Sequence, residues 1–136
     1  MQTEVTNAEQ RRSKRAKWLA FALIAFGLLL HAFVGLFKSE AGPNTFSLGL
    51  MVWSWLPYLV GLTLLIWLRN SIIPLAGIIG PLILDLVNYY SVFIAPGSST
   101  AALGLLWMPL WNLVIVEPVG LLIGWLLSKT KIFGVT

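Results

Sequence analysis

The stretch "WLRNSIIP", residues 67–74, joins two long apolar runs of the sequence through only a few polar residues. The runs on either side of it cover 48–68 and 72–94, and each has the roughly 20 residues that a helix needs to cross a bilayer. Two further runs of this kind, 18–37 and 101–127, come before and after them. A link this short makes the two helices that it joins pack against each other in opposite directions. The sequence therefore predicts an all-α integral membrane protein, an antiparallel bundle of four transmembrane helices.

The composition also favours a bilayer over water as the surroundings of this chain. Of the 136 residues, 58% are hydrophobic and only 10% are charged, and the mean hydropathy is +0.87. A soluble core has no use for so much apolar surface. The lipid bilayer is thus the first partner that we expect.

The positive charges predict how the bundle is oriented. Five of the nine Lys and Arg residues lie in segment 11–17, and Arg69, Lys129 and Lys131 are expected on the same side. Only Lys38 falls on the other side. Cytoplasmic segments carry the excess of Lys and Arg, so both termini are predicted to be cytoplasmic in a multi-pass protein of the cell inner membrane. The basic segment is typical of topology signals that touch anionic lipid, and no nucleic-acid partner is expected.

The chain divides into three parts by polarity. Residues 1–17 lack apolar periodicity and are expected to form a disordered, basic cytoplasmic tail that can become helical near the membrane surface. Residues 18–127 form the predicted membrane domain, with helices at about 18–37, 48–68, 72–94 and 101–127. Residues 128–136 are predicted to be a second cytoplasmic tail.

Very few polar side chains interrupt the apolar runs, and they are His31, Asp85, Asn88, Asn112 and Glu117. A charged side chain near the bilayer centre costs on the order of 3 kcal/mol, so such residues usually face protein or a cavity. Counting about 1.5 Å per residue from the middle of each run places His31, Asp85 and Asn112 in one layer, and Glu117 nearer the inner side. We predict that Asp85 hydrogen-bonds His31, Asn112 or both, because each would otherwise be unsatisfied in hydrocarbon.

Asp85 is the polar residue that we expect to be functional. Pro81 on the same helix face removes an amide and frees the carbonyl of Gly77 one turn below the carboxyl. A buried carboxyl beside a histidine and a proline is an arrangement that tunes protonation. The alternative for His31, Asn88 and Asn112 is structural, since interhelical hydrogen bonds of this kind contribute about 1 kcal/mol each.

Small residues and prolines predict where helices pack closely or bend. Gly27 and Gly35 lie four residues before and after His31, and Gly120 and Gly124 follow Glu117 on one helix face. These glycines are predicted to be helix-packing residues. Kinks are expected at the prolines inside the apolar runs, which are Pro57, Pro81, Pro109 and Pro118.

Glu117 leaves several interpretations open. It can be protonated and bonded to a backbone carbonyl, it can pair with a basic group of a partner subunit through the glycine face, or it can belong to an ion pathway. Around an α-helix it lies about 140° from Asn112, at about 100° per residue. The two are therefore expected to serve different contacts, unless the kink at Pro118 rotates them together.

The sequence contains no pattern that favours catalysis or a bound metal. One histidine, no cysteine and two carboxylates at different depths do not supply an all-protein zinc or di-iron site. A nucleophile elbow, a phosphate loop and a Ser-His-Asp pattern are all missing. No enzyme activity and no cofactor are therefore expected.

Two functions remain. The first, which the small-residue helix faces favour, is a non-catalytic accessory or assembly subunit of a membrane complex, bound to another membrane protein or to itself. The second is an autonomous, oligomeric, proton-linked transporter or channel for a small solute or lipid. It would use Asp85 with His31, and Glu117 as a second station toward the cytoplasm.

Overall fold

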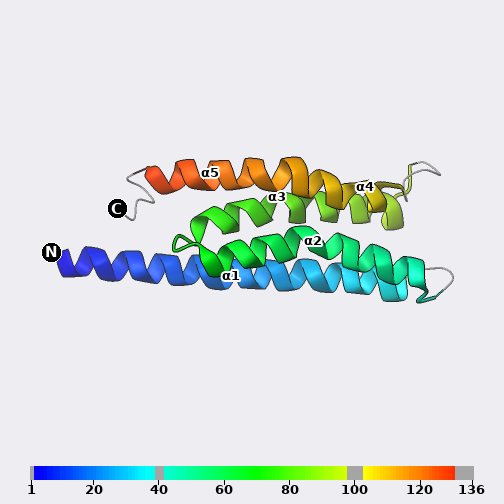
Figure 1. Ribbon diagram of the computed structural model, residues 1–136, viewed down its shortest axis with the longest axis horizontal. Coiled ribbons are helices and arrows are strands. Elements are labelled where there is room, and N and C mark those ends of the chain that lie inside the picture. Colours follow the sequence, from blue (N-terminus) through cyan, green and yellow to red (C-terminus); the bar gives the residue numbers. More distant parts are fainter. Residues whose placement is uncertain (1, 39–41, 98–102, 131–136) are drawn as a thin grey trace.

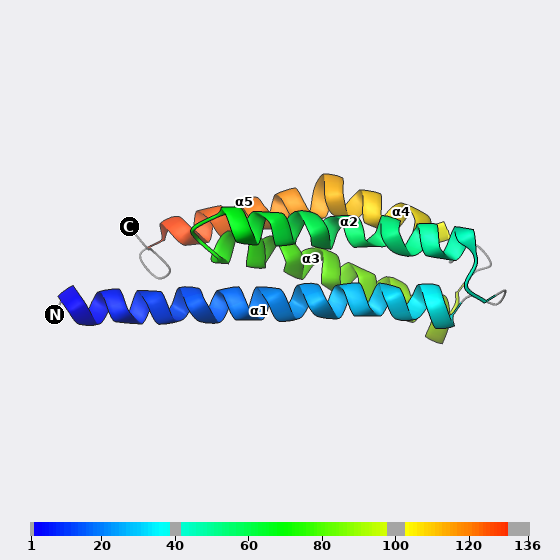
Figure 2. The same ribbon diagram turned by 60° about the horizontal axis from the view of Figure 1, so that its bottom comes forward.

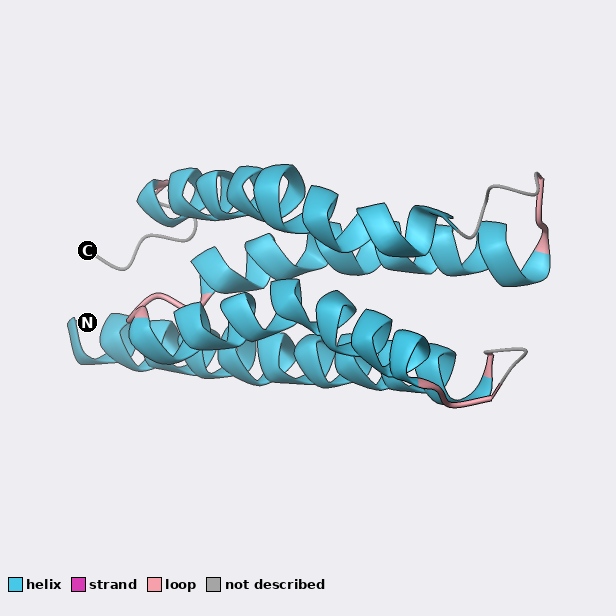
Figure 3. Cartoon of the chain, turned by 45° about the vertical axis from the view of Figure 1, so that its right-hand side comes forward, coloured by secondary structure: helices cyan, strands magenta, loops and turns pink. Residues whose placement is uncertain are grey.

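The fold is a set of long helices that run alternately up and down one axis (Figure 1). The computed structural model describes residues 2–38, 42–97 and 103–130. In chain order the elements are α1 (Gln2–Phe37), α2 (Thr45–Trp67), α3 (Ile72–Tyr89), the π-helical turn η1 (Tyr90–Ile94), α4 (Leu103–Trp111), the π-helical turn η2 (Asn112–Val116) and α5 (Glu117–Lys129). Since each π turn continues a helix, the described residues form four rods and no strand (Figure 3). The predicted all-helical architecture is confirmed.

All four rods are long and apolar enough to span a membrane, over Gln10–Phe37, Thr45–Trp67, Ile72–Ile94 and Leu103–Lys129. Large apolar side chains cover the outside of the bundle, among them Trp67, whose surface is 82% exposed. Monomeric soluble proteins rarely expose large continuous apolar surfaces, whereas lipid favours them. The structure therefore indicates a multi-pass membrane protein. The start of α1 and the end of α5 lie at the same end of the bundle (Figure 2), and their membrane side stays a prediction.

The N-terminal segment differs from the sequence prediction. Residues 1–17 were expected to be a disordered tail, but α1 begins at Gln2 and continues without a break into the apolar run. No glycine or proline occurs before Gly27, and the segment 8–17 consists mostly of Ala, Glu, Gln, Arg and Lys, which are good helix formers. The apolar span supplies the helical nucleus, so adding turns to it costs little. At the other end, α5 takes in residues 128 and 129, and residues 131–136 of the predicted tail lie outside the described residues.

The central hairpin matches the short link in the sequence. The α2 helix ends at Trp67 and α3 begins at Ile72, and the two helices contact each other. At its other end α2 begins at Thr45, three residues earlier than expected. Asn44 caps it, since its side chain accepts a hydrogen bond from the Ser47 amide while the Ser47 hydroxyl accepts one from the Asn44 amide. This reciprocal pair satisfies two amides that a helix start would leave free.

The fourth rod changes its hydrogen-bond pattern just before Pro118. In η2 the amide of Glu117 bonds to the carbonyl of Asn112, five residues back instead of four. Proline has no amide and its ring crowds the preceding turn, and widening that turn relieves both effects. Pro57, Pro81 and Pro109 also lie inside helices, and bends at these three prolines stay a prediction.

The predicted glycine faces pack against other helices of the same chain. Gly27 lies against the ring of Tyr58, and a Cβ at Gly35 would lie 3.0 Å from the Cβ of Met51, so both glycines serve the α1–α2 contact. The α5 glycines serve the α3–α5 contact, where a Cβ at Gly120 would lie 2.6 Å from the carbonyl oxygen of Ala76. Gly124 lies equally close to Ile73 and Ala76. Side chains larger than hydrogen do not fit such close helix approaches.

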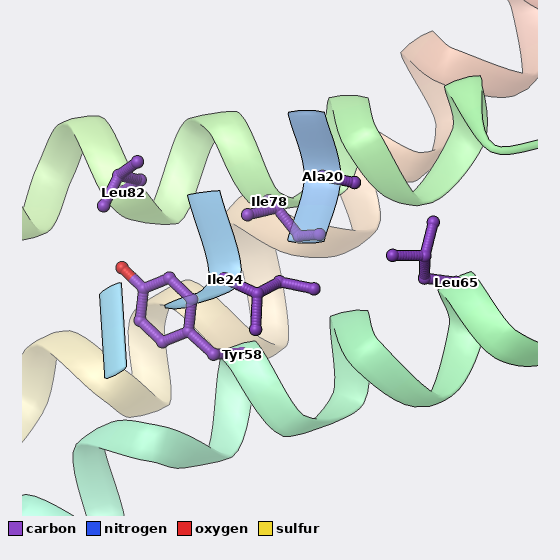
Figure 4. Close-up of a cluster of buried hydrophobic side chains, with 6 residues drawn as sticks. All are labelled: Ala20, Ile24, Tyr58, Leu65, Ile78 and Leu82. Atoms are coloured by element: carbon purple, nitrogen blue, oxygen red, sulfur yellow. The ribbon is translucent and has the colours of Figure 1, made fainter. Parts of the chain in front are cut away.

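The apolar core lies where the first three rods meet. It consists of Ala20, Ile24, Tyr58, Leu65, Ile78 and Leu82 (Figure 4). Tyr58 is 1% exposed and is the largest side chain of this cluster. Its hydroxyl points out of the apolar cluster toward α3 (Figure 4). The core therefore ends at a polar group in the middle of the bundle.

Candidate functional site

Asp85 connects all four rods through its carboxylate. It lies on α3 and is only 4% exposed. The Nε2 atom of His31 on α1 lies 2.9 Å from its Oδ2 atom. The Tyr58 hydroxyl on α2 donates to the same oxygen at 2.6 Å, and the Asn112 amide on η2 donates to Oδ1 at 2.8 Å. We call these four residues the Asp85 cluster.

The three donors explain how a carboxylate can lie inside an apolar bundle. An isolated carboxylate loses its hydration when it is buried, and the penalty is several kcal/mol unless other groups replace the water. Hydrogen bonds to an ionised group are shorter and stronger than those between neutral groups. His31 adds an ion pair with Asp85 when its ring is protonated. Donors from three rods thus replace the water that the Asp85 carboxylate loses on burial.

The structure brings together the three residues that the depth count placed in one layer. His31, Asp85 and Asn112 meet, whereas Asn88 lies one turn along α3 and faces α4. Asn88 is 8% exposed, and its Oδ1 atom would lie 2.6 Å from a Cβ at Gly104. Gly104 therefore leaves room for the Asn88 amide, which belongs to the α3–α4 contact and is not bonded to Asp85. The functional roles of all four residues stay predictions.

Tyr58 is the member of the cluster that the sequence analysis missed. The intramembrane polar residues predicted from the sequence are charged residues, amides and a histidine, and tyrosine is not among them. A usable signal was present, because Tyr58 stands at the middle of the run 48–68, away from the interfaces where tyrosine is enriched. A tyrosine at that depth needs a partner for its hydroxyl. Gly27 makes room for the ring, which lies 5.8 Å from the ring of His31.

Glu117 is buried separately from the Asp85 cluster. It is 2% exposed, and neither carboxyl oxygen has a hydrogen-bond partner among the described residues. Its Oε1 atom would lie 3.6 Å from a Cβ at Gly61, and its Cγ atom 3.7 Å from a Cβ at Gly77. The carboxyl therefore lies between α2 and α3, within the bundle of this chain. A buried polar group without a partner is costly, and such groups often mark functional sites.

The π turn explains why Asn112 and Glu117 both point inward. In an α-helix, residues five apart point in very different directions, and the sequence predicted different contacts on that ground. In η2 the two residues are instead bonded through their backbones and lie almost one above the other. Asn112 reaches Asp85, while Glu117 reaches the level of Gly61 and Gly77. The two residues thus turn to the same side through the π turn and still serve different surroundings, while a kink at Pro118 stays a prediction.

A cavity of about 390 Å³ borders the Asp85 cluster on the side of the α1–α2 turn. We call it the His31 chamber. Its lining comes from α1, α2, η1 and α4 and consists of His31, Val34, Gly35, Lys38, Phe46, Ser47, Leu50, Met51, Ser54, Val92, Phe93 and Leu105. Two indole hydrogen bonds join these helices, from Trp55 to the Leu28 carbonyl on α1 and from Trp53 to the Leu106 carbonyl on α4.

The imidazole of His31 stands between the chamber and Asp85. Its Nε2 atom bonds to Asp85, while its Nδ1 atom makes no hydrogen bond with any described residue. An imidazole can accept a proton on one nitrogen and release the other proton from its second nitrogen, which makes histidine a common proton shuttle. His31 thus links the lining of the chamber to a buried carboxylate. No group of three or more potential metal ligands comes together within the described residues.

No family model, curated protein or solved structure matches this chain.

Proposed function

We propose that this protein is a proton-linked transporter or channel for a small solute. In this proposal His31 and Asp85 carry the proton, and Glu117 is a second proton-binding residue. The observation that supports this proposal is the position of His31, which lines a cavity and bonds to a buried carboxylate through its Nε2 atom. A cavity beside a proton acceptor allows solute binding and protonation to influence each other.

The proposed proton path begins in the His31 chamber. A proton binds to Nδ1 of His31, and the proton on Nε2 moves along the hydrogen bond to Oδ2 of Asp85. Tyr58 and Asn112 hold the carboxylate in position during this transfer. Moving the proton on to Glu117 requires water or a shift of the helices, because Glu117 makes no hydrogen bond with the described residues. Such a shift is the usual basis of alternating access.

An accessory subunit of a membrane complex remains the second hypothesis. Its main support was the idea that the glycine faces of the first and fourth predicted helices are available to a partner. Gly27 and Gly35 are buried against α2 and Gly124 against α3, while the half-buried Gly120 packs closely on α3, so most of this glycine surface is used within the chain. The hypothesis now depends on the exposed apolar exterior, which lipid can cover equally well.

The proposal is tested with the purified protein in liposomes that contain a pH-sensitive dye. Anionic, cationic and neutral small solutes are added outside, and the internal pH is followed. We expect at least one solute class to move protons through the wild-type protein and not through Asp85→Asn. Asp85→Asn keeps an oxygen for the Tyr58 and His31 hydrogen bonds, so its thermal unfolding should stay close to that of the wild type.

Matched variants separate transport from folding. Tyr90→Phe alters a tyrosine that is 56% exposed and should transport normally. The proposal is overturned when no solute moves protons through the wild type, or when Asp85→Asn moves them as fast as the wild type. A stoichiometric protein partner that copurifies from native membranes, together with an absence of proton movement, would establish the accessory subunit instead.

A further inference from the structure

We infer that the His31 chamber binds a small organic anion that has one carboxylate and an apolar body. This inference rests on the proposed proton-linked function and assigns its solute class. The chamber volume of about 390 Å³ is at the lower end of the range of roughly 300–1,000 Å³ that is typical of small-molecule sites. The site therefore fits a compact solute.

Two unused polar groups lie in the wall of the chamber. The Nδ1 atom of His31 and the hydroxyl of Ser54 make no hydrogen bond with any described residue, although Ser54 is only 5% exposed. The other lining serine, Ser47, is already engaged in the cap of α2. Both residues line the chamber, so their unengaged polar atoms are available to a molecule that enters it. Both groups can donate to the same acceptor when the His31 ring is protonated.

The charges of the lining favour an anion over a cation. Lys38 directly follows the end of α1, seven residues after His31 or about 10 Å further along at about 1.5 Å per residue, and its amide still bonds to the Val34 carbonyl. Its Nζ atom lies 5.9 Å from the ring centres of Phe33 and Phe93, and it forms no ion pair within the described residues. The lining contains no Asp or Glu. Among the described residues, a cationic solute would thus meet the positive charge of Lys38 and no lining carboxylate, whereas an anion gains from that charge.

The rest of the lining indicates the shape of the solute. Apolar side chains surround the polar groups, and they are Val34, Leu50, Met51, Val92, Phe93 and Leu105. Apolar walls of this kind favour burial of hydrocarbon, at about 25 cal/mol per Å² of surface removed from water. A solute with one carboxylate and a short hydrocarbon chain matches both the polar groups and the apolar walls of the chamber. A solute with several charges would leave some of them in contact with apolar walls.

The same placement explains how the solute would be coupled to protons. A carboxylate beside Nδ1 of His31 favours the protonated ring, because opposite charges at hydrogen-bond distance attract strongly away from water. The protonated ring then lies between the solute carboxylate and Asp85, and each carboxylate accepts one of its two N–H groups. Binding of the anion therefore brings one proton into the site, so anion and proton travel in the same direction.

The experiment measures equilibrium binding of radiolabelled butyrate to the purified protein in lipid nanodiscs. Butan-1-ol and n-butylammonium, which have the same chain with a neutral or a positive end, are the competitors. We expect butyrate to bind and to take up one proton per molecule bound, and neither competitor to displace it at equal concentration. Ser54→Ala should weaken butyrate binding about tenfold, the usual effect of losing a hydrogen bond to a charged group.

Matched variants show whether the effect belongs to the chamber. Ser54→Thr keeps the hydroxyl and should bind almost as well as the wild type. Ser128→Ala alters a half-buried serine that bonds only within α5, away from the chamber, and should leave butyrate binding unchanged. Lys38→Gln should weaken binding and reduce its dependence on salt, because a screened charge at the mouth is removed. Lys129→Gln at the opposite end of the bundle is its control. Equal binding in Ser54→Ala and Lys38→Gln would overturn the inference, as would displacement by n-butylammonium.

Two further outcomes separate this inference from the proposed function and from a lipid ligand. Butyrate that binds with the expected dependence on Ser54 but moves no protons in liposomes contradicts the proposed function and leaves the binding site standing. Protons that move with another solute class, without butyrate binding, contradict the inference alone. The last comparison measures the affinity of fatty acids from butyrate to palmitate. If affinity rises steadily up to the longest chain, the site binds a membrane lipid, and the inference of a small solute is overturned.

Discussion

The Nε2 atom of His31 lies 2.9 Å from Oδ2 of Asp85, so that α1 and α3 are joined by a histidine–carboxylate pair inside the bundle. The pair is completed by the Tyr58 hydroxyl and the Asn112 amide. His31 also lines the chamber, and under the proposed function it exchanges protons with the solute there, which a purely structural histidine does not do.

Replacing His31 by glutamine tests that difference. A glutamine amide can still donate to Asp85, but it cannot accept and release a proton at physiological pH. We expect His31→Gln to unfold close to the wild-type temperature and to lose proton movement in dye-loaded liposomes. A variant that unfolds early and still moves protons would show that His31 is structural.

Tyr58→Phe should weaken the bundle measurably. The change removes one donor from Asp85 while leaving the ring packed against Gly27. Loss of a hydrogen bond to a charged group usually costs about 1.5–3 kcal/mol, and within membranes the cost averages closer to 1 kcal/mol. Reversible unfolding in mixed detergent micelles measures the difference. Tyr90→Phe is the control and should stay within about 0.5 kcal/mol of the wild type.

Gly120→Ala should destabilise the folded chain itself and not only its association with other proteins. The added Cβ would lie 2.6 Å from the Ala76 carbonyl oxygen and 2.9 Å from the Gly77 Cα, and both are backbone atoms. Overpacking of this kind typically costs about 1–3 kcal/mol. Gly49→Ala is the control, because no atom lies within 4 Å of its Cβ position. A Gly120→Ala protein that unfolds like Gly49→Ala would contradict the close α3–α5 contact.

Glu117→Gln should leave stability unchanged or raise it. The wild-type carboxyl makes no hydrogen bond within the described residues, so the neutral amide loses no contact and carries no charge into the bundle. Proton movement should nevertheless fall, because an amide cannot serve as the second station. Unfolding and liposome assays on the same preparation measure the stability and the proton movement of the variant. A loss of stability of more than about 1 kcal/mol would instead assign Glu117 a structural partner.

The polar layer shows how far sequence reasoning reached into the site. The depth count placed His31, Asp85 and Asn112 at one level because rise per residue is nearly constant along a helix, and the structure joins these three through Asp85. The count could not place Asn88, because depth says nothing about which neighbour a side chain faces. It also missed Tyr58, since an apolar ring with one hydroxyl does not stand out in an apolar run.

The sequence by itself determined the four helices, their short connections and the identity of the few polar groups inside them. Apolar length and turn composition are local properties, and local properties suffice to predict elements. The tertiary structure alone decided that the glycine faces are filled by helices of the same chain and that a π turn aligns Glu117 with Asn112. It also decided that a cavity borders His31. These features depend on which helix lies beside which and on small rotations about helix axes, and residues far apart in the chain set them jointly.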